Sequence, residues 1–372
     1  MDRIFSVYAW RTDAPEIDRR VFLELPALPY ELQDALDRLR ADDETPLYAQ
    51  IEEYLQFPFL SQELYGRQKL SALNGLAQRL AGLNPEEAAA FQGLVKMEDK
   101  PVSLDRLTGL SNSTGCCHVV GGIQSDRELG RFYAENGFIP GVEELPDEIF
   151  DLLDFERIGR EQRQAEGGVF AEGSYVVRHS GIAEIHTQPE PFPEAADYAI
   201  LLEASTGSGE AVRIKLPAEA ERLEKLTQWN CLDCSAPMLR DAVSAETDVH
   251  AVNRMAERLQ EMTHEELAKY KALLEILNCR EFQGAEQLSR TMGEYLLTAN
   301  YQTPAEIAKG ELTCILEKPD MEEMLPYLDL DGYGQALLDR RGGILSDYGL
   351  VERADGEPVL TTQEPSEREL TM

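Results

Sequence analysis

An internal repeat constrains the fold of this chain more than any other feature of its sequence. Residues 73–80 (LNGLAQRL) align with residues 252–259 (VNRMAERL), and Asn, Ala, Arg and Leu are identical at that register. The alignment continues without a gap as far as Leu94 and Leu273. Because repeated sequences fold into repeated structures, the alignment predicts the same helical unit at two places in the chain.

A second block recurs further along the chain. Residues 153–159 (LDFERIG) align with residues 328–334 (LDLDGYG), and the next glycine pair, Gly167-Gly168, then aligns with Gly342-Gly343. Together the two blocks predict a duplication. The predicted copies lie near residues 1–190 and 195–372.

The predicted elements give each copy a small α+β unit, a helical unit and a third unit with an acidic helix, a glycine turn and a short strand. Alternating apolar residues predict strands at 4–10, 21–25, 198–203 and 212–216. A helix with apolar residues at Leu32, Leu36 and Leu39 follows the first pair of strands. In the helical units, Asn84 and Thr263 are predicted N-caps. The strand of the third unit is predicted at 175–178.

The length of 372 residues exceeds one typical hydrophobic core, so several small domains are expected. Gln188-Pro189-Glu190-Pro191-Phe192-Pro193 is the predicted linker between the copies. The predicted domains are 1–65 (α+β), 66–125 (helical) and 126–190 (acidic helix plus strand) in copy one, then 195–248 (α+β), 249–300 (helical) and 301–353 (third domain) in copy two, with a loose tail at 354–372.

The charge balance excludes several classes of partner. The chain carries 69 Asp and Glu against 35 Lys and Arg, a net charge of -34. Both halves share the excess, with 34 acids and 18 bases in residues 1–190 and 35 acids and 17 bases in residues 191–372. Such a chain is repelled by phosphate backbones and by anionic lipid headgroups, so we expect neither nucleic acid nor membrane as a direct partner. The predicted partner is a basic protein.

The compartment is predicted to be the cytoplasm. The first ten residues (MDRIFSVYAW) lack the sustained apolar core of a secretory signal, and no run of eighteen apolar residues follows. The six cysteines are sparse for this length and are interpreted as reduced thiols rather than as a disulfide framework.

Possible metal and redox motifs are weak. Cys231-Leu232-Asp233-Cys234 has the spacing of half a zinc site, and Cys116-Cys117-His118 would have to supply the rest with the wrong spacing. No strand–CxxC–helix context favours thioredoxin-like chemistry. We therefore predict no metal site, and interpret these cysteines as ordinary buried thiols.

Possible catalytic motifs are equally weak. His264-Glu265-Glu266 lacks the second histidine of a metalloprotease, and Thr263 with Glu266 predicts a capping box instead. Thr206-Gly207-Ser208-Gly209 lacks the Lys-Ser or Lys-Thr of a phosphate loop and predicts a hairpin turn. No catalytic residue, cofactor or enzyme activity is therefore predicted.

The acidic stretch 143–154 is the most informative local feature. We expect one helical window, with Leu145, Ile149 and Leu152 facing the core and carboxylates on another side. Carboxylates four residues apart repeat every ~6 Å along a helix, a spacing comparable to that of successive phosphates on a nucleic-acid strand. The excess of 34 charges corresponds to roughly 58 Å of duplex DNA. A solvated helix face is the alternative interpretation of any single acidic helix.

Several segments resemble the ArdA antirestriction proteins of mobile genetic elements. The resemblance covers most of residues 1–180. The resembling segments are 73–94, 126–133 (DRELGRFY), 153–160 (LDFERIGR), 167–170 (GGVF) and 173–176 (GSYV). Copy two keeps the helical pair and the 328–334 block but has no clear counterpart of Glu128-Leu129-Gly130-Arg131.

The resemblance implies a highly acidic, elongated α+β protein in which each copy has three small domains and mimics bent B-form DNA. Family members occupy the DNA-binding groove of type I restriction–modification enzymes, are typically dimers and have no catalytic residues. The predicted partner-binding residues are Glu143, Glu144, Asp147, Glu148, Asp151, Asp154, Glu156, Asp329 and Asp331.

This chain departs from the family by its doubling. Our hypothesis is that the tandem copies form an intramolecular pseudo-dimer, and a homodimer of the whole chain is the alternative. Copy two interrupts its acidic run around Tyr327, Gly332 and Tyr333, so it could be a half that has kept the fold and lost the mimicry. Two other functions stay open: an acidic adaptor or regulator that binds another basic DNA-processing protein, and an enzyme without a recognisable motif.

Overall fold

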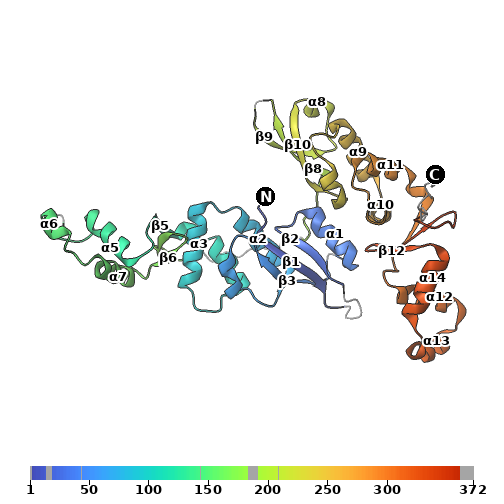
Figure 1. The fold of residues 1–372 in the computed structure, drawn as a ribbon, viewed down its shortest axis with the longest axis horizontal. Helices are drawn as coiled ribbons and strands as arrows, with labels where there is room; N and C mark the ends of the chain where they lie inside the picture. Colours follow the sequence, from blue (N-terminus) through green and yellow to red (C-terminus); the bar gives the residue numbers. More distant parts are fainter. Residues whose placement is uncertain are drawn as a thin grey trace, which may run out of the picture. The chain divides into compact units, whose positions relative to one another are not determined.

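Helices and four small antiparallel sheets make up the computed structural model, as the predicted α+β class requires (Figure 1). The structure describes residues 2–13, 19–42, 44–142, 144–182, 192–207 and 209–360. The chain divides into two units. Unit 1 comprises residues 1–27 and 44–192, and unit 2 comprises residues 28–43 and 193–372. Most of the predicted linker falls outside the described residues.

The first sheet of unit 1 has the strand order β2-β1-β3-β4. Its strands are β1 (Phe5–Arg11), β2 (Val21–Leu25), β3 (Leu47–Tyr54) and β4 (Arg67–Lys69). In β2 the buried Val21, Leu23 and Leu25 alternate with exposed residues, which is the pattern of a sheet with one buried face. The strands predicted at 4–10 and 21–25 are thus confirmed, and β3 and β4 were not predicted.

Three helices follow in unit 1: α2 (Leu70–Ala81), α3 (Pro85–Met97) and α4 (Leu104–Ser111). The apolar stripe of α2 is buried as its spacing predicts. Asn84 caps α3 as predicted, since its side chain accepts a hydrogen bond from the Glu87 amide at 2.9 Å.

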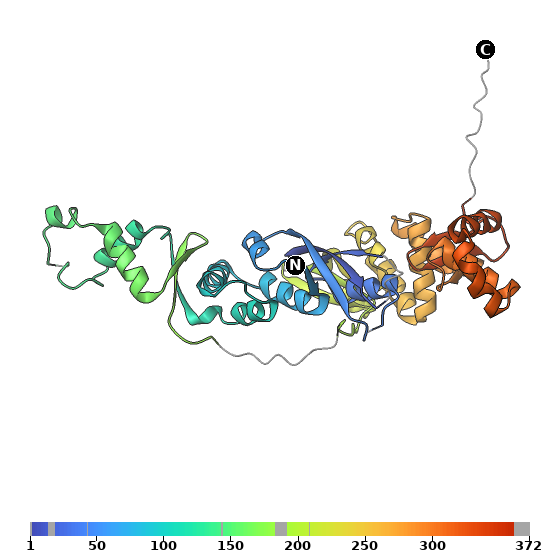
Figure 2. The same ribbon diagram turned by 90° about the horizontal axis from the view of Figure 1, so that it is seen from below.

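The last part of unit 1 combines a three-stranded sheet with three helices. Its elements are β5 (Cys117–Gly121), α5 (Asp126–Glu135), α6 (Asp147–Phe150), α7 (Phe155–Glu166), β6 (Val169–Ala171) and β7 (Ser174–Arg178). The sheet order is β5-β7-β6. Within unit 1, the first sheet, the α2–α4 helices and this last part follow one another in series (Figures 1 and 2).

The first sheet of unit 2 has the order β10-β8-β9. Its strands are β8 (Ile200–Thr206), β9 (Ala211–Leu216) and β10 (Leu226–Cys234), and the short helix α8 (Ala220–Leu223) connects β9 to β10. Strands β8 and β9 pair antiparallel, and the Gly209 amide donates to the Thr206 carbonyl at 2.8 Å, as the hairpin interpretation predicts. The strands predicted at 198–203 and 212–216 are confirmed.

The rest of unit 2 repeats the order of unit 1. Its elements are α9 (Val249–Glu261), α10 (His264–Ile276), α11 (Phe282–Thr291), β11 (Tyr295–Thr298), α12 (Pro304–Ile315), α13 (Lys318–Met324), α14 (Leu330–Arg341), β12 (Ile344–Ser346) and β13 (Gly349–Arg353). The sheet order β11-β13-β12 matches β5-β7-β6. The predicted capping box of α10 is confirmed, because Thr263 Oγ1 accepts from the Glu266 amide at 3.2 Å.

The side-chain oxygen of a buried asparagine accepts a matching backbone hydrogen bond in both units. The Ala27 amide donates to Asn74 Oδ1 at 2.7 Å, and the Ala218 amide donates to Asn253 Oδ1 at 2.8 Å. Asn74 and Asn253 are the aligned asparagines of the sequence repeat. Their identity therefore has a structural reason, because each satisfies a backbone amide just beyond the second strand of its sheet.

Helix α1 (Pro29–Leu39) follows β2 in the sequence but is grouped with unit 2. The ammonium group of Lys271 in α10 lies 2.9 Å from Asp34 and 2.8 Å from Asp37 on this helix. Tyr348 donates a hydrogen bond to Asp34 at 2.8 Å. Further ion pairs join Arg240 to Glu31, Arg38 to Asp347 and Arg40 to Glu306. The segment predicted as part of an α+β domain at 1–65 is thus held by buried and half-buried charges of unit 2.

The end of the described chain packs on unit 2. Val359 is buried and its amide donates to the Gly342 carbonyl at 3.0 Å. The predicted loose tail begins at Ala354, and its residues beyond 360 lie outside the described part of the chain.

Candidate functional site

The acidic segment of unit 1, residues 141–156, connects α5 to α7 and is called acidic segment 1. It contains seven Asp or Glu and neither Lys nor Arg. A small apolar cluster holds it in place. Ala134, Val142 and Phe155 are buried in that cluster, and Leu145, Phe150 and Leu153 are packed against them.

Helices α5 and α7 cross closely because each has a glycine at the contact. A methyl group added at Gly159 would overlap the Asp126 carbonyl, and one added at Gly130 would overlap the Phe155 carbonyl. In unit 2, a methyl group at Gly334 of α14 would overlap the Pro304 carbonyl of α12. Gly159 and Gly334 are aligned residues of the repeat. The glycines therefore set the distance between the two helices that carry each acidic segment.

The predicted helical window across 143–154 is wrong. Helix α6 covers only Asp147–Phe150. The amides of Ile149 and Phe150 donate to the Pro146 carbonyl, and the chain then turns through the Leu152 and Leu153 amides. This turn brings Leu153 back to the apolar cluster before α7 begins. The carboxylates therefore do not form a helical row with four-residue spacing.

The predicted core-facing residues of this segment also need correction. Leu145 is packed against the apolar cluster as expected. Ile149 and Leu152 are 46% and 78% exposed. A helix of a single turn is too short to bury an apolar stripe, so the Ile149 and Leu152 side chains remain at the surface.

The predicted partner-binding acids of unit 1 have different surroundings. Glu144, Glu148 and Asp151 are exposed, and none of them takes part in an ion pair in the described structure. Glu143 lies outside the described residues, and of Asp147 only the backbone is described. Three unpaired carboxylates thus remain accessible to a partner in acidic segment 1.

Asp154 and Asp329 have a structural role. Asp154 caps α7 by accepting a hydrogen bond from the Arg157 amide at 3.1 Å, and Asp329 caps α14 by accepting one from the Gly332 amide at 3.0 Å. Both carboxylates are exposed, so they add negative charge while they stabilise a helix N-terminus. Glu156 is paired with Arg160 at 2.8 Å, which partly neutralises it.

Unit 2 has a matching segment, of which only Asp329 and Asp331 were predicted as partner-binding residues. Residues 316–331, called acidic segment 2, contain six Asp or Glu and one Lys. They include α13 and the one-turn helix η5 (Leu325–Tyr327). Glu317, Glu323 and Asp331 are exposed and have no ion pair in the described structure. The sequence alignment could have identified this segment, because the register that aligns Asp154 with Asp329 also aligns Glu148 with Glu323.

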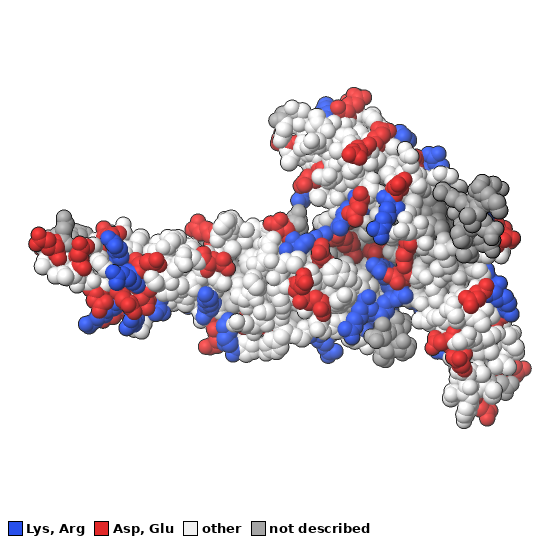
Figure 3. All heavy atoms as spheres, in the orientation of Figure 1, with Lys and Arg blue, Asp and Glu red and all other residues white. Residues whose placement is uncertain are grey.

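Helices α5 and α7 themselves carry mixed charge. On the face drawn in Figure 3, Lys and Arg are interspersed with Asp and Glu over these helices, with no continuous band of carboxylates. The ion pairs on them join Arg131 to Glu135, Arg157 to Glu161, Arg160 to Glu156 and Arg163 to Asp126. The hydrogen bond from Arg163 holds the pKa of Asp126 below its ordinary value. Helices α5 and α7 therefore carry acids that are partly neutralised by arginine, whereas acidic segment 1 contains neither Lys nor Arg.

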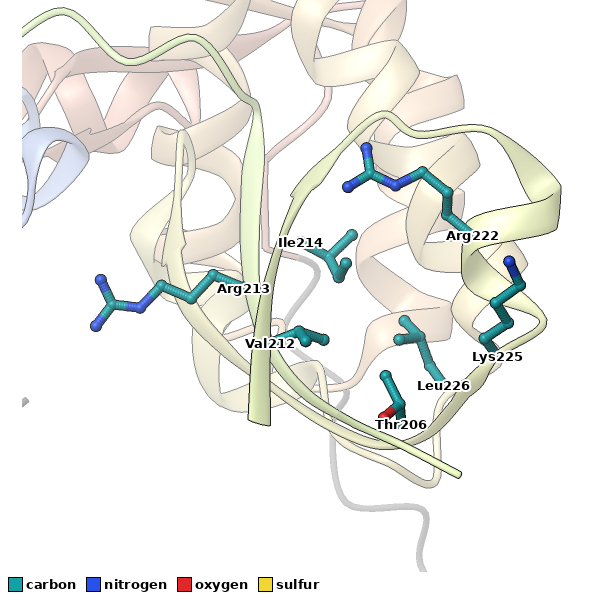
Figure 4. Close-up of a pocket in the computed structure, with 7 residues that line it drawn as sticks. All are labelled: Thr206, Val212, Arg213, Ile214, Arg222, Lys225 and Leu226. Carbon is teal, nitrogen blue, oxygen red and sulfur yellow. The ribbon is translucent and has the colours of Figure 1, made fainter. Parts of the chain in front are cut away.

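A hollow of about 460 Å³ in unit 2 is the other feature with binding potential (Figure 4). Val212, Ile214 and Leu226 form its apolar part, with Arg222 and Lys225 at its rim, whereas the Arg213 side chain points away from it. Its seven lining residues include no carboxylate, histidine or cysteine, so the lining offers no acid–base pair.

Cys231 and Cys234 are ill suited to metal or redox chemistry. Cys231 and Cys234 lie in β10 and are buried, and burial raises the pKa of the Cys231 thiol and raises that of Cys234 to about 12. Protonated thiols are poor ligands and nucleophiles. Within the described part of the chain, no three His, Cys, Asp or Glu side chains converge as a metal-binding group. The described helices include none with the length and apolar character needed to cross a membrane.

Neither a scan against protein-family models nor a search of the curated proteins finds a match for this chain.

Proposed function

We propose that this protein is an antirestriction protein that acts as a DNA mimic and occupies the DNA-binding groove of a type I restriction–modification enzyme. One observation carries the proposal. Acidic segments 1 and 2 contain seven and six Asp or Glu against no Lys or Arg and one Lys, in a chain with a net charge of -34. A basic groove attracts such surfaces and associates with them faster than with neutral ones. The segments resembling ArdA proteins point to the same partner.

The repeated order of elements supports the view that the chain is a tandem of two ArdA-like copies. The aligned asparagines, the aligned N-caps Asp154 and Asp329, and the aligned glycines Gly159 and Gly334 each have the same role in both units. Because acidic segment 2 keeps its carboxylates, we propose that both copies contribute to mimicry. This replaces the hypothesis that copy two had lost it.

A competition assay tests this function. A purified type I methyltransferase is bound to a fluorescent DNA duplex that contains its recognition site, and the protein is titrated in. We expect displacement of the DNA at low salt that weakens steeply as salt is raised, because exposed charges are screened. Failure to displace DNA at any salt concentration would refute the proposed target.

The distribution of charge favours one alternative. Acidic segments 1 and 2 carry exposed acids without ion pairs in the described structure, and helices α5 and α7 beside segment 1 carry mixed charge (Figure 3). Local acidic surfaces of this kind suit an adaptor or regulator that binds another basic DNA-processing protein. Binding to a basic recombinase or nucleoid protein, without displacement of DNA from the methyltransferase, would favour this function.

A further inference from the structure

Large apolar side chains are exposed at the same two positions of both acidic segments. Ile149 and Met324 are each 46% exposed, and Leu152 and Tyr327 are 78% and 83% exposed. Ile149 aligns with Met324, and Leu152 with Tyr327, at the register that the helix caps Asp154 and Asp329 fix independently.

Ordered backbone holds these side chains outward. The Leu152 amide donates to the Ile149 carbonyl at 3.1 Å, and the next residue, Leu153, packs against the apolar cluster. In unit 2, Tyr327 ends η5, and the amide of Leu328 donates to the Leu325 carbonyl at 3.3 Å. The exposure therefore follows from the turn geometry.

A single exposed leucine is ordinary in a folded protein and carries no argument by itself. The recurrence is different, because Leu152 and Tyr327 are largely exposed at aligned positions of the two units. Each pair is flanked by exposed acids, Glu148 with Asp154 and Glu323 with Asp329.

We propose that each acidic segment docks on a protein surface in which Lys and Arg side chains surround an apolar depression, with Leu152 and Tyr327 as the inserted anchors. Buried apolar and aromatic anchors with a polar rim are the arrangement that concentrates binding energy in protein interfaces. Nucleic acids and anionic membranes are repelled by the flanking carboxylates, and a second copy of the chain would bring like charges together. The inference rests on the proposed function, since it concerns the same surface, and it adds an apolar contribution that charge mimicry lacks.

Two fluorescent peptides of equal charge provide a probe that does not depend on the enzyme. One alternates Lys with Trp, and the other alternates Lys with Gly. We expect the wild-type chain to bind the Lys–Trp peptide about tenfold more tightly, the size of one buried anchor. The charge-neutral double variant Leu152→Ser/Tyr327→Ser should lose this preference. Equal affinity of the wild-type chain for the two peptides, or a preference that survives the double variant, would overturn the inference.

The matched control is Leu296→Ser/Tyr65→Ser. It makes the same changes at side chains that lie outside both acidic segments and are 54% and 66% exposed. It should keep the preference for the Lys–Trp peptide. All four residues are exposed, so neither variant is expected to unfold the protein.

The methyltransferase competition assay separates this inference from the proposed function. If the wild-type chain prefers the Lys–Trp peptide but does not displace DNA, the anchors are supported and the proposed target is wrong. If it displaces DNA and shows no peptide preference, and the double variant displaces DNA equally well, the target is supported and the anchors are wrong. Where both proposals hold, the double variant should need about tenfold more protein to displace the DNA.

Discussion

Replacing Lys271 by methionine should destabilise unit 2 severely. The Lys271 side chain is 2% exposed, and its ammonium group is within 2.9 Å of Asp34 and 2.8 Å of Asp37. Methionine keeps the unbranched stem but removes the charge, and it leaves two carboxylates that are 11% and 9% exposed without their cation. Breaking a buried pair in this way costs about 3–5 kcal/mol. For a unit of this size, each kcal/mol lowers Tm by roughly 2–4 °C, so the expected loss is about 6–20 °C.

The two tryptophans allow this loss to be assigned to one unit. Trp10 lies in unit 1 and Trp229 in unit 2, so a Trp10→Phe background leaves fluorescence that reports on unit 2 alone. The matched control is Lys309→Met, which makes the same change at an exposed lysine of α12 without an ion pair, and it should cost under about 0.5 kcal/mol. A loss below about 1 kcal/mol in Lys271→Met, or equal losses in both variants, would refute the reasoning.

The pH dependence of the same variant gives a second check. Burial lowers the pKa of Lys271, but Asp34 and Asp37 outweigh burial and the net pKa lies above its ordinary value of 10.5. A raised lysine pKa stabilises the fold at pH values below the unfolded value and loses this contribution as pH rises through the folded value. The advantage of the wild type over Lys271→Met should therefore persist up to about pH 10.5 and decline above it.

Three further changes have defined outcomes. Burial raises the pKa of Asp233 from 3.8 to about 6, so the folded state binds the extra proton between these values. Wild-type unit 2 should therefore lose about 2 kcal/mol relative to Asp233→Asn between pH 4 and pH 7, measured by urea unfolding. A constant difference would contradict the assigned burial effect. Gly159→Ala should destabilise unit 1 by about 1–3 kcal/mol, because the added methyl group overlaps backbone. Gly75→Ala, at an exposed site of α2 with open space, should be neutral or stabilising. Trp10 fluorescence in a Trp229→Phe background measures both effects, and equal effects would exclude the glycine contact as the cause. The triple variant Glu144→Gln/Glu148→Gln/Asp151→Asn should weaken binding to a type I methyltransferase, while each single change does little. The charge-matched control Glu52→Gln/Glu203→Gln/Glu224→Gln should weaken binding less. Equal losses of affinity in the two triple variants would show that only total charge matters.

Local patterns predicted the local structure well. The alternation of Val21, Leu23 and Leu25 indicates a strand with one buried face, and Thr263 with Glu266 indicates a helix start, because both signals act over a few residues. The aligned blocks 153–159 and 328–334 contain Gly159 and Gly334, but their sequence did not single out these glycines. Glycine is needed at these positions because two helices cross closely in each unit, and this crossing is visible only in the three-dimensional structure.

Contacts distant in the sequence were not predictable in the same way. Nothing local to Asp34 indicates that its partner is Lys271, so the grouping of α1 with unit 2 could not be foreseen. Apolar spacing in 145–152 suggested a buried stripe, but spacing does not show whether another element covers it. Leu152 is exposed because α6 ends at Phe150 and the chain turns toward Leu153 and Phe155.

The salt dependence of binding tests the central claim most directly. The affinity of the wild-type chain for a type I methyltransferase is measured from about 50 to 300 mM salt, beside that of the methyltransferase for its DNA. If carboxylates replace phosphates in the groove, log affinity should fall with log salt for the protein as it does for DNA, and the slope should become shallower in the acidic-segment triple variant. An affinity that does not change with salt, or a slope that the triple variant leaves unchanged, would contradict DNA mimicry by these segments.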